Sequence, residues 1–305
     1  MNRALKELCK ILGGHPDIVL TPEEPMSKHT TFRIGGPAEL FCELKTPQVV
    51  VHAMRAAARL EIRPFILGNG SNLLVSDEGV PGAVFKITGG ECHRSGIFVS
   101  MDAGVSLTAA ARFALRQGLS GFEFAYGIPG TVGGAVVMNA GAYGFEMQDF
   151  IIETSYLTPT GEVTRAGRRE LEFGYRTSFF KKRPGCVMLT AKIGLREGDP
   201  EKIKQKMEET MAARREKQPL ELPSAGSIFK RPAGHYAGAL IEQCGLKGYR
   251  IGGAEVSPKH AGFIVNVGGA TCADVLYLIE HIRNTVLKEC GVTLECEVLC
   301  APRRV

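Results

Sequence analysis

The chain has 305 residues, of which 44% are hydrophobic and 23% charged, and a formal net charge of +5 at pH 7. This length predicts two or three compact units, because single cores rarely grow beyond about 250 to 300 residues. A soluble cytoplasmic protein that does not bind nucleic acid is expected: no apolar run approaches the about 20 residues of a membrane span, the first residues lack a secretory leader, and the basic residues are dispersed.

Helical and strand patterns alternate before residue 200. A helix is expected within 1–14, and a second over 46–60, where Thr46 can cap the first turn and Pro47 fits inside it. The other elements expected in this part are short strands at 64–67, 73–75 and 83–87 and a helix at 107–117.

The remainder of the chain predicts a second series of elements. A charged, exposed helix is expected over 200–217, and a long helix over 273–289 should end at Gly291. The apolar residues on one face of that long helix are Val275, Leu278, Ile279, Ile282 and Val286. Further elements are a helix at 237–244 and strands at 262–267 and 293–300.

These elements predict an α+β fold with units at 1–90, 91–198 and 199–296, and they allow the segment 297–305 to pack back on the first. Nine cysteines are an odd number without a CxxC pair, so reduced thiols are expected. Cys290, Cys296 and Cys300 are close in sequence but fit no common zinc spacing, and no metal is expected.

Two glycine-rich segments are candidate binding loops. Gly68–Asn72 lies between two expected strands, where it could form a nest of N–H groups for a pyrophosphate or, equally, a tight hairpin turn. The stretch GIPGTVGGAVVMNAGAYG at 127–144 is also apolar, so it should be buried. A buried backbone with few side chains favours close approach of a dinucleotide over mere close packing.

Seven stretches carry a specific order and spacing. They are TTFRIGGPAE (30–39), PFILGNGSNLLVSDEG (64–79), GIPGTVGGAVVMNAGAYG (127–144), EFGYRTSFF (172–180), PSAGSIFKRP (223–232), LIEQCGLKGYRIGGAEVSPKHAGFIVN (240–266) and LECEV (294–298). Together they resemble the UDP-N-acetylenolpyruvoylglucosamine reductases (MurB). Between Phe180 and Val187 the chain is short, so it resembles the branch without a long tyrosine loop.

The resemblance implies a fold and a reaction. The first two units would form an FAD-binding fold of the vanillyl-alcohol-oxidase (PCMH) type, and the third would bind substrate. FAD would be held non-covalently and would carry hydride from NADPH to UDP-N-acetylglucosamine enolpyruvate. The product, UDP-N-acetylmuramate, is a peptidoglycan precursor. The protein is expected to act as a monomer.

The resemblance also implies three catalytic residues. Arg176 would pair with the substrate carboxylate, Ser227 would give a proton to the substrate carbon, and Glu297 would assist proton delivery or stabilise the intermediate. Glu297 is expected on the last strand, on the side that carries Leu299 in place of a basic residue common in the family. Each also has an ordinary interpretation: an ion-paired arginine, a serine bonded to backbone, and a solvent-facing carboxylate.

The implied binding residues form three sets. The FAD set in the first loop is Gly68, Asn69, Gly70, Ser71, Asn72 and Leu73. The FAD set in the second segment is Gly127, Ile128, Pro129, Gly130, Thr131, Gly133, Gly134, Asn139, Gly141 and Ala142. The substrate set is Lys217, Lys230, Arg231 and Lys247.

Two other functions remain open from the sequence. One is a flavin oxidase or dehydrogenase of another small substrate, since fold does not fix chemistry. The other is a sugar-nucleotide-binding protein without redox activity, in which the glycine loops hold UDP alone.

Overall fold

The computed structural model describes residues 1–302. The chain divides into two compact units, each assembled from separate segments. Unit 1 comprises Met1–Pro22, Leu40–Asn69 and Gly82–Ala212. Unit 2 comprises Glu23–Glu39, Gly70–Pro81 and the residues from Ala213 onward. The three-part division at residues 90 and 198 stays a prediction.

Unit 1 contains most of the regular structure. Its helices are α1 (Arg3–Leu12), α2 (Pro47–Arg59), α3 (Leu107–Arg116), α4 (Val132–Met138), α5 (Phe179–Lys182) and most of α6 (Pro200–Lys217), with 3-10 turns η2 (Glu123–Ala125) and η3 (Met147–Asp149). Three strands lie mostly in unit 1 and have one end in unit 2: β1 (Ile18–Pro25), β2 (Pro37–Leu44) and β5 (Val80–Ile87). The other strands of unit 1 are β3 (Phe65–Leu67), β6 (Cys92–Ser95), β7 (Phe98–Asp102), β8 (Leu119–Ser120), β9 (Gly141–Ala142), β10 (Phe145–Glu146), β11 (Ile151–Leu157), β12 (Val163–Gly167), β13 (Val187–Gly194) and β14 (Arg196–Glu197).

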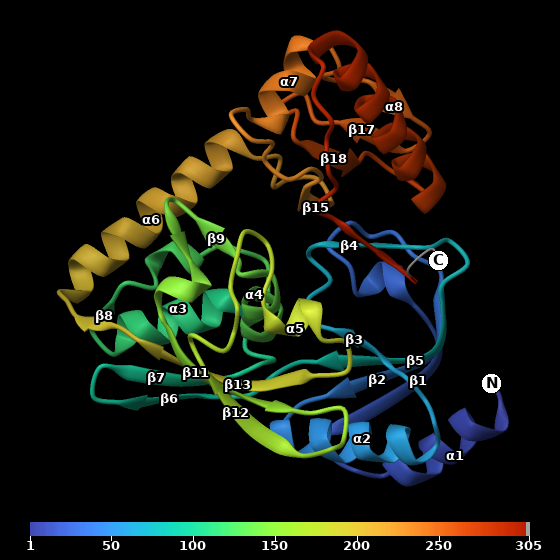
Figure 1. Ribbon diagram of the computed structural model, residues 1–305, viewed down its shortest axis with the longest axis vertical. Helices are drawn as coiled ribbons and strands as arrows, with labels where there is room; N and C mark the ends of the chain where they lie inside the picture. Colours follow the sequence, from blue (N-terminus) through green and yellow to red (C-terminus); the bar gives the residue numbers. More distant parts are fainter. Residues whose placement is uncertain (303–305) are drawn as a thin grey trace. The chain divides into compact units, whose positions relative to one another are not determined.

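Two larger sheets organise unit 1 (Figure 1). One has the order β1-β2-β5-β3, and α1 and α2 bury apolar faces against it. The other has the order β12-β11-β13-β7-β6, and α3 and α4 pack on it around Val99, Met101 and Ala191. Two-stranded pairs β10-β9 and β14-β8 complete the unit.

Helix α2 illustrates how local sequence determines where a helix of this unit begins and which face it buries. Thr46 Oγ1 accepts a hydrogen bond from the N–H of Val49 at 3.4 Å, and Pro47 occupies the first turn, where it has no backbone bond to lose. Val49, Val50 and Ala53 then repeat at helical spacing and are buried. The expected helix at 46–60 is therefore confirmed.

Unit 2 is built around one antiparallel sheet and one long helix. Its strands are β4 (Leu73–Val75), β15 (Ser224–Ser227), β16 (Arg250–Ile251), β17 (Ala254–Val256), β18 (Phe263–Asn266) and β19 (Leu299–Ala301), and its helical elements are η1 (Met26–Lys28), α7 (Ala237–Gln243) and α8 (Cys272–Cys290). The sheet order is β15-β18-β17-β16, and β19 pairs in parallel with β4. Figure 1 shows α8, in red, next to β17.

Helix α8 is fixed at both ends. At its N-terminus Thr271 and Asp274 form a capping box, and Gly291 ends it in the left-handed conformation at φ 69°. A residue remote in sequence adds to the N-terminal cap: Asp77 Oδ1 and Oδ2 accept the N–H groups of Cys272 and Ala273 at 2.7 and 3.1 Å. The segment Gly70–Pro81 is thus tied to the C-terminal part of unit 2.

Three expectations about local structure are wrong. Gly68–Asn72 is not a hairpin turn, because β3 pairs with β5 while β4 pairs with β19. The glycine-rich segment contains the helix α4, capped by Thr131. The expected strand at 293–300 is reduced to β19, since main-chain pairing before it is limited to the isolated bridge between Cys296 and Phe229. Burial still alternates there, with Leu294 and Val298 inside.

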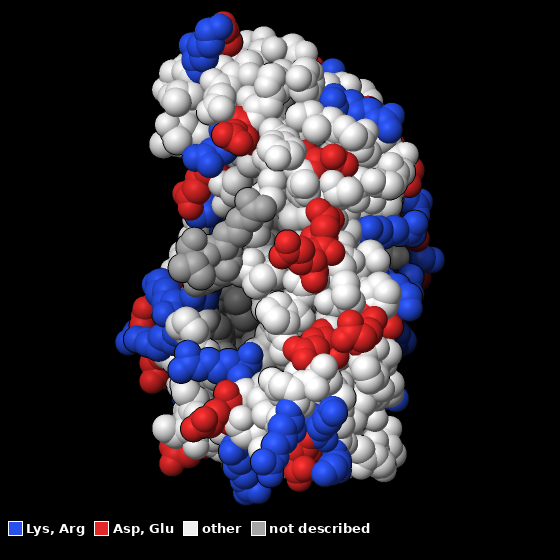
Figure 2. Space-filling view, turned by 90° about the vertical axis from the view of Figure 1, so that its right-hand side faces the viewer, with Lys and Arg blue, Asp and Glu red and all other residues white. Residues whose placement is uncertain are grey.

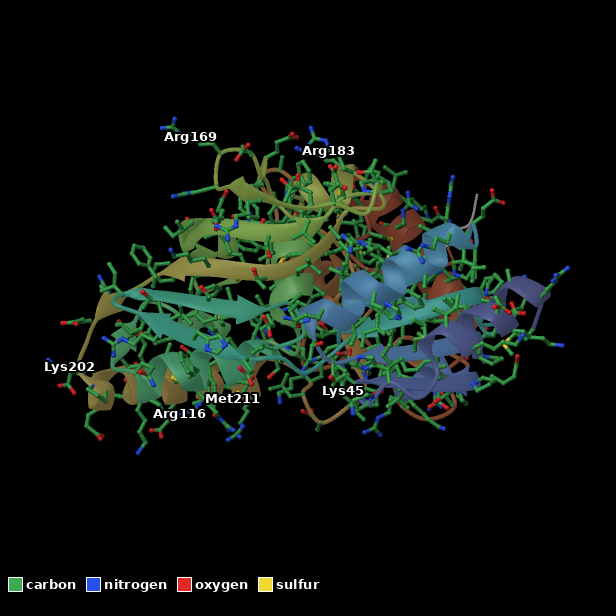
Figure 3. All side chains as sticks on the ribbon, turned by 90° about the horizontal axis from the view of Figure 1, so that it is seen from below. Lys45, Arg116, Arg169, Arg183, Lys202 and Met211 are labelled. Atoms are coloured by element: carbon green, nitrogen blue, oxygen red, sulfur yellow. The ribbon has the colours of Figure 1, made fainter. Side chains whose placement is uncertain are left out.

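Charge is dispersed over the surface. Figure 2 shows one face, on which Lys/Arg and Asp/Glu side chains both occur. In Figure 3 the exposed side chains of Arg116, Arg169, Arg183 and Lys202 extend outward from different elements. Among residues 1–302, no helix is both long enough and apolar enough to cross a membrane.

We predict that Asp77→Ala lowers the Tm by about 2 to 4 °C, because loss of a carboxylate cap costs about 1 kcal/mol. Thermal unfolding followed by circular dichroism measures this shift. Glu78→Ala changes the neighbouring exposed carboxylate and should leave the Tm unchanged. Equal Tm values for the two variants would show that Asp77 does not stabilise α8.

Candidate functional site

The loop Gly68–Asn72 has the geometry of an anion-binding nest. Gly70 adopts φ 59°, and a Cβ at this position would collide with the carbonyl oxygen of His29. Within residues 1–302 the structure records no protein acceptor for the main-chain N–H groups of residues 69 to 72. Successive N–H groups around a left-handed glycine form a concavity that suits a phosphate.

The two predicted FAD segments approach one another inside unit 1. A Cβ on Gly68 would lie 2.6 Å from Thr131 Oγ1, closer than real side chains allow. Asn69 Nδ2 donates a hydrogen bond to the carbonyl oxygen of Pro129 at 3.3 Å. The first loop therefore packs directly on the start of the second segment, and glycine is required at position 68.

Part of the second segment is close packing against protein. The N–H groups of Val132 and Gly133 donate to the carbonyl oxygens of Val105 and Ala103 at 2.8 and 2.9 Å. A Cβ on Gly133 would lie 3.0 Å from Ala103 Cβ. A larger residue than glycine at position 133 would therefore crowd Ala103, because α4 packs against β7 and the residues after it. At Gly134 the nearest atom to an added Cβ is Thr131 Oγ1, at the ordinary contact distance of 3.5 Å.

Ser227 lies at the end of β15, opposite Phe263 in β18. The pairing register shifts between Ser224 and Ser227, which marks an irregularity of the kind that redirects a side chain at functional sites. Gly226 accommodates it with φ 77°, and a Cβ there would meet open space. The half-buried Ser227 is therefore accessible from the side of Gly226.

Glu297 is held beside this strand by its main chain. Its N–H donates to the carbonyl oxygen of Ile228 at 2.7 Å, and its carbonyl oxygen accepts from Asn72 Nδ2 at 3.1 Å. The carbonyl oxygen of Asn72 in turn accepts the N–H of Leu299 at 3.1 Å. Asn72 therefore binds the chain at Glu297 and two residues after it, while the N–H of Glu297 itself bonds to Ile228, the residue after Ser227.

Arg176 belongs to unit 1, whereas Ser227 and Glu297 belong to unit 2. Its side chain is 20% exposed, with the guanidinium carbon 5.0 Å from the centre of the Tyr175 ring and Nη1 4.0 Å from Glu146 Oε1. The residue adopts φ 55°, which is uncommon for a non-glycine side chain and costs backbone energy.

The four basic residues of the predicted substrate set all lie in unit 2. Lys217 is exposed at the end of α6. Lys230 pairs with Glu295, and Lys247 Nζ lies 2.6 Å from Glu242 Oε1. The guanidinium carbon of Arg231 lies 4.0 Å from the centre of the Tyr236 ring. Their contact with a diphosphate stays a prediction.

Asn139 has a role that the sequence did not indicate. Its side chain is fully buried, and Nδ2 donates to Glu146 Oε2 and to the carbonyl oxygen of Gly174 at 2.9 and 3.1 Å. Both N–H donors of the amide are thus engaged within unit 1, so contact of Asn139 with FAD stays a prediction for its remaining atoms. Glu146 was missed as well, because it lies two residues beyond the matched stretch, which ends at Gly144.

His260 is a half-buried residue in a turn of unit 2. Its Nδ1 accepts the N–H of Gly262 at 3.1 Å, and its ring meets the edge of Phe263 with centroids 5.0 Å apart. Burial lowers the pKa of His260, since the charged imidazolium would lose its hydration. A Cβ on Gly238 would lie 3.3 Å from the ring, so the imidazole fills space between two glycines.

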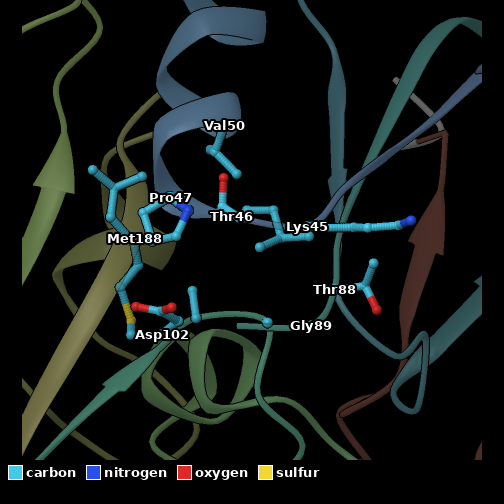
Figure 4. Close-up of a pocket in the computed structure, with 12 residues that line it drawn as sticks. Lys45, Thr46, Pro47, Val50, Thr88, Gly89, Asp102 and Met188 are labelled. Atoms are coloured by element: carbon cyan, nitrogen blue, oxygen red, sulfur yellow. The ribbon is translucent and has the colours of Figure 1, made fainter. Parts of the chain in front are cut away.

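The cavity at the start of α2 is too small for FAD or a sugar nucleotide. It is lined by residues that include Lys45, Thr46, Asp102 and Met188, and it has a volume of about 10 Å³ (Figure 4). That volume is enough for about one water molecule. A second hollow, in unit 2, is open and measures about 380 Å³; its lining is Ser27, Lys28, Thr30 and Arg33.

Comparison with known proteins identifies the family. A family model described as an FAD binding domain matches residues 38–167, and one described as the C-terminal domain of UDP-N-acetylenolpyruvoylglucosamine reductase matches 218–301. The reductase of this name from Caldanaerobacter subterraneus subsp. tengcongensis is 48% identical over 276 residues, which are 90% of this chain and 91% of the relative. The chain belongs to the MurB family.

Further MurB proteins support the assignment. One from Lachnoclostridium phytofermentans is 46% identical and covers 97% of this chain and 96% of its own length. The crystal structure of MurB from Thermus caldophilus matches with a TM-score of 0.79 at 38% identity, over 93% of this chain and 99% of that chain. The expected α+β fold with an FAD-binding part and a C-terminal domain is confirmed.

FAD is the cofactor of this MurB chain, and the residues present fit it. The N–H groups of residues 69 to 72 provide donors for a pyrophosphate. The hollow that Lys28 and Arg33 line lies beside this loop, since the N–H of Thr31 donates to the carbonyl oxygen of Gly70 at 3.3 Å. Of these two basic residues, Lys28 is ion-paired with Glu24 at 3.3 Å. Gly68 lets this loop pack closely on Thr131 at the start of the second segment.

We predict that Gly68→Ala reduces FAD retention, because its Cβ must displace Thr131 or the loop itself. Gly167→Ala is the matched control: Gly167 also lies in unit 1 at an ordinary φ, and the nearest atom to an added Cβ is 3.5 Å away. The ratio of absorbance at the flavin band to that at the protein band measures the bound FAD. Equal ratios in the two purified variants would show that this approach is not needed.

We predict that His260 makes stability depend on pH. Its folded pKa is lowered from about 6.5, so the unfolded chain binds the proton more readily. The contribution of the neutral ring is present above about pH 6.5 and is lost as the pH falls toward the folded pKa. His260→Asn retains an acceptor but cannot titrate, so the Tm advantage of wild type over this variant should shrink below pH 6.5. A difference that stays constant from pH 8 to 5 would contradict the prediction.

Proposed function

We propose that this chain reduces UDP-N-acetylglucosamine enolpyruvate to UDP-N-acetylmuramate, with NADPH as the electron donor, as a step of peptidoglycan synthesis. The sugar-nucleotide substrate follows from membership of the MurB family. The observation that supports the residue assignment is the main-chain hydrogen bond from Glu297 to Ile228, the residue after Ser227, together with the bonds from Asn72 to Glu297 and Leu299.

The three catalytic residues would divide the chemistry. When bound, FAD carries two electrons from NADPH to the vinyl carbon of the substrate. Arg176 would pair with the substrate carboxylate and stabilise the negative charge that develops on it. Ser227 would donate a proton from Oγ to the adjacent carbon, and Glu297 would assist that transfer or stabilise the intermediate.

Binding would be shared between the glycine segments and the basic residues of unit 2. The N–H groups of Gly68–Asn72 would hold the FAD pyrophosphate, and the backbone of 127–142 would lie against the cofactor. Lys217, Lys230, Arg231 and Lys247 would attract the diphosphate of the substrate. We propose that the enzyme acts as a monomer in the cytoplasm, where nucleotide sugars and NADPH are available, and binds no nucleic acid.

A single cuvette tests the reaction. The purified protein should be yellow, anaerobic NADPH should bleach it, and UDP-N-acetylglucosamine enolpyruvate should restore the colour. A flavin oxidase acting on another substrate would bleach without being recoloured by this nucleotide. A sugar-nucleotide-binding protein would show no flavin colour at all.

We predict that Ser227→Ala leaves bleaching by NADPH unchanged and slows recolouring by about 10²- to 10⁴-fold, the usual contribution of a positioned acid. Stopped-flow absorbance separates the two steps. Ser224→Ala changes a half-buried serine of the same strand and should recolour at the wild-type rate. Equal slowing of both steps in Ser227→Ala would count against the assignment.

A further inference from the structure

The turn that carries Arg176 has a strained backbone and is stabilised by side chains of other segments. Gly174 and Thr177 exchange main-chain hydrogen bonds of 3.1 and 3.2 Å, which leaves Tyr175 and Arg176 as the two central residues. A non-glycine residue in the left-handed region costs about 1 to 3 kcal/mol and persists where its surroundings fix it. Lys181 Nζ contributes by donating to the carbonyl oxygen of Arg176 at 3.0 Å.

Asn139 connects this turn to Glu146. It lies at the end of α4 with φ 45° and ψ 53°, and its amide bridges the carbonyl oxygen of Gly174 and Glu146 Oε2. Its Oδ1 accepts the N–H of Gln148 at 3.0 Å. The side chain is fully buried, and both its Nδ2 and its Oδ1 are hydrogen-bonded. It therefore holds Glu146 and the turn at a fixed distance from one another.

Glu146 is itself fixed on three sides. Oε2 accepts Asn139 Nδ2 at 2.9 Å and Gln148 Nε2 at 2.7 Å. The N–H of Glu146 donates to Asp149 Oδ2 at 2.8 Å. Glu146 lies on the second strand of the tight hairpin β9-β10, whose turn residues Tyr143 and Gly144 both have positive φ.

The second oxygen of this carboxylate faces Arg176. Glu146 Oε1 lies 4.0 Å from Arg176 Nη1, and the two side chains are 27% and 20% exposed. A guanidinium has five N–H donors, so contact through Nη1 is compatible with pairing of the same group to a substrate carboxylate. A carboxylate held by two hydrogen bonds restricts the directions the guanidinium can take.

We propose that Glu146, fixed by Asn139 and Gln148, is the positioning residue for Arg176 in the reduction of the enolpyruvyl substrate. This inference rests on the proposed function. Glu146 acts through Arg176: it orients the guanidinium toward the substrate carboxylate and does not touch the substrate. Asn139 and the turn 174–177 fix the backbone of the same arginine.

Glu146→Gln tests the proposal because it retains an oxygen for Asn139 and Gln148 but removes the negative charge. We expect it to slow recolouring of the NADPH-reduced protein by about 10- to 100-fold, the effect of a small misplacement of a reacting group. Bleaching by NADPH should stay at the wild-type rate. Glu153→Gln is the control, since Glu153 pairs with Arg165 at 3.4 Å on the surface of the same unit.

A double-mutant cycle separates positioning from a general structural effect. In an Arg176→Ala background, Glu146→Gln should change the recolouring rate less than about 2-fold, because the residue it acts through is absent. Equal slowing by Glu146→Gln in both backgrounds, or a wild-type rate in the single variant, would overturn the proposal. If Glu146→Gln does not fold, Gln148→Leu removes one of the bonds to the carboxylate and should slow recolouring in the same way.

A second readout is independent of the substrate. In a protein labelled with ¹⁵N-arginine, the Nε–H signal that disappears in Arg176→Lys should be sharp in wild type and broadened or shifted in Glu146→Gln. An unchanged signal would overturn the proposal even if the enolpyruvyl nucleotide is not a substrate. Failure of wild type to recolour, with a changed signal, would instead contradict only the proposed reaction.

Discussion

The position of Glu297 within unit 2 depends on main-chain hydrogen bonds and on Asn72. Its side chain binds the carbonyl oxygen of Glu297, and its own carbonyl oxygen binds the N–H of Leu299. The same Glu297 donates its N–H to Ile228. Asn72 therefore links the end of a predicted cofactor loop to Glu297, and Glu297 in turn bonds to Ile228, the residue after the predicted proton donor.

The glycines of the two predicted FAD segments have different structural roles. Gly68 and Gly70 give the backbone a close approach to Thr131 and His29 and leave N–H groups of the loop without protein acceptors. Gly133 instead lets α4 pack against Ala103, with its N–H bonded to protein. Asn139 uses both amide hydrogens to hold the turn that carries Arg176. The two segments that the sequence predicts as binding loops thus have three roles: leaving N–H groups for a cofactor, packing a helix, and supporting the turn that carries Arg176.

Helices with caps and a clear apolar face could be predicted from the sequence. The expected limits of α2, from Thr46 with Pro47, and of α8, which was to end at Gly291, agree with the structure within one residue. The strand expected at 293–300 was wrong, because alternating burial is also produced by an extended segment with few main-chain partners. Helix α4 was missed because paired glycines disfavour a helix in isolation, and packing on β7 and β13 decides the outcome.

Contacts between residues far apart in the chain could not be predicted from the sequence. Asp77 caps α8 from a position 195 residues away from Cys272, and Glu23–Glu39 joins the C-terminal residues in unit 2. No local pattern encodes such contacts. The candidate residues Arg176, Ser227 and Glu297 came from the motif match, whereas Glu146 and Asn139 emerged only from the hydrogen bonds around Arg176.

A crystal structure of the protein with FAD and the enolpyruvyl nucleotide tests the central claim most directly. The account predicts pyrophosphate oxygens within hydrogen-bond reach, about 3 Å, of the N–H groups of residues 69 to 72. It also predicts Ser227 Oγ at about 3 Å from the substrate carbon to be protonated and Arg176 paired with the carboxylate. A cofactor that leaves those N–H groups facing water, or a substrate beyond the reach of both side chains, would contradict it.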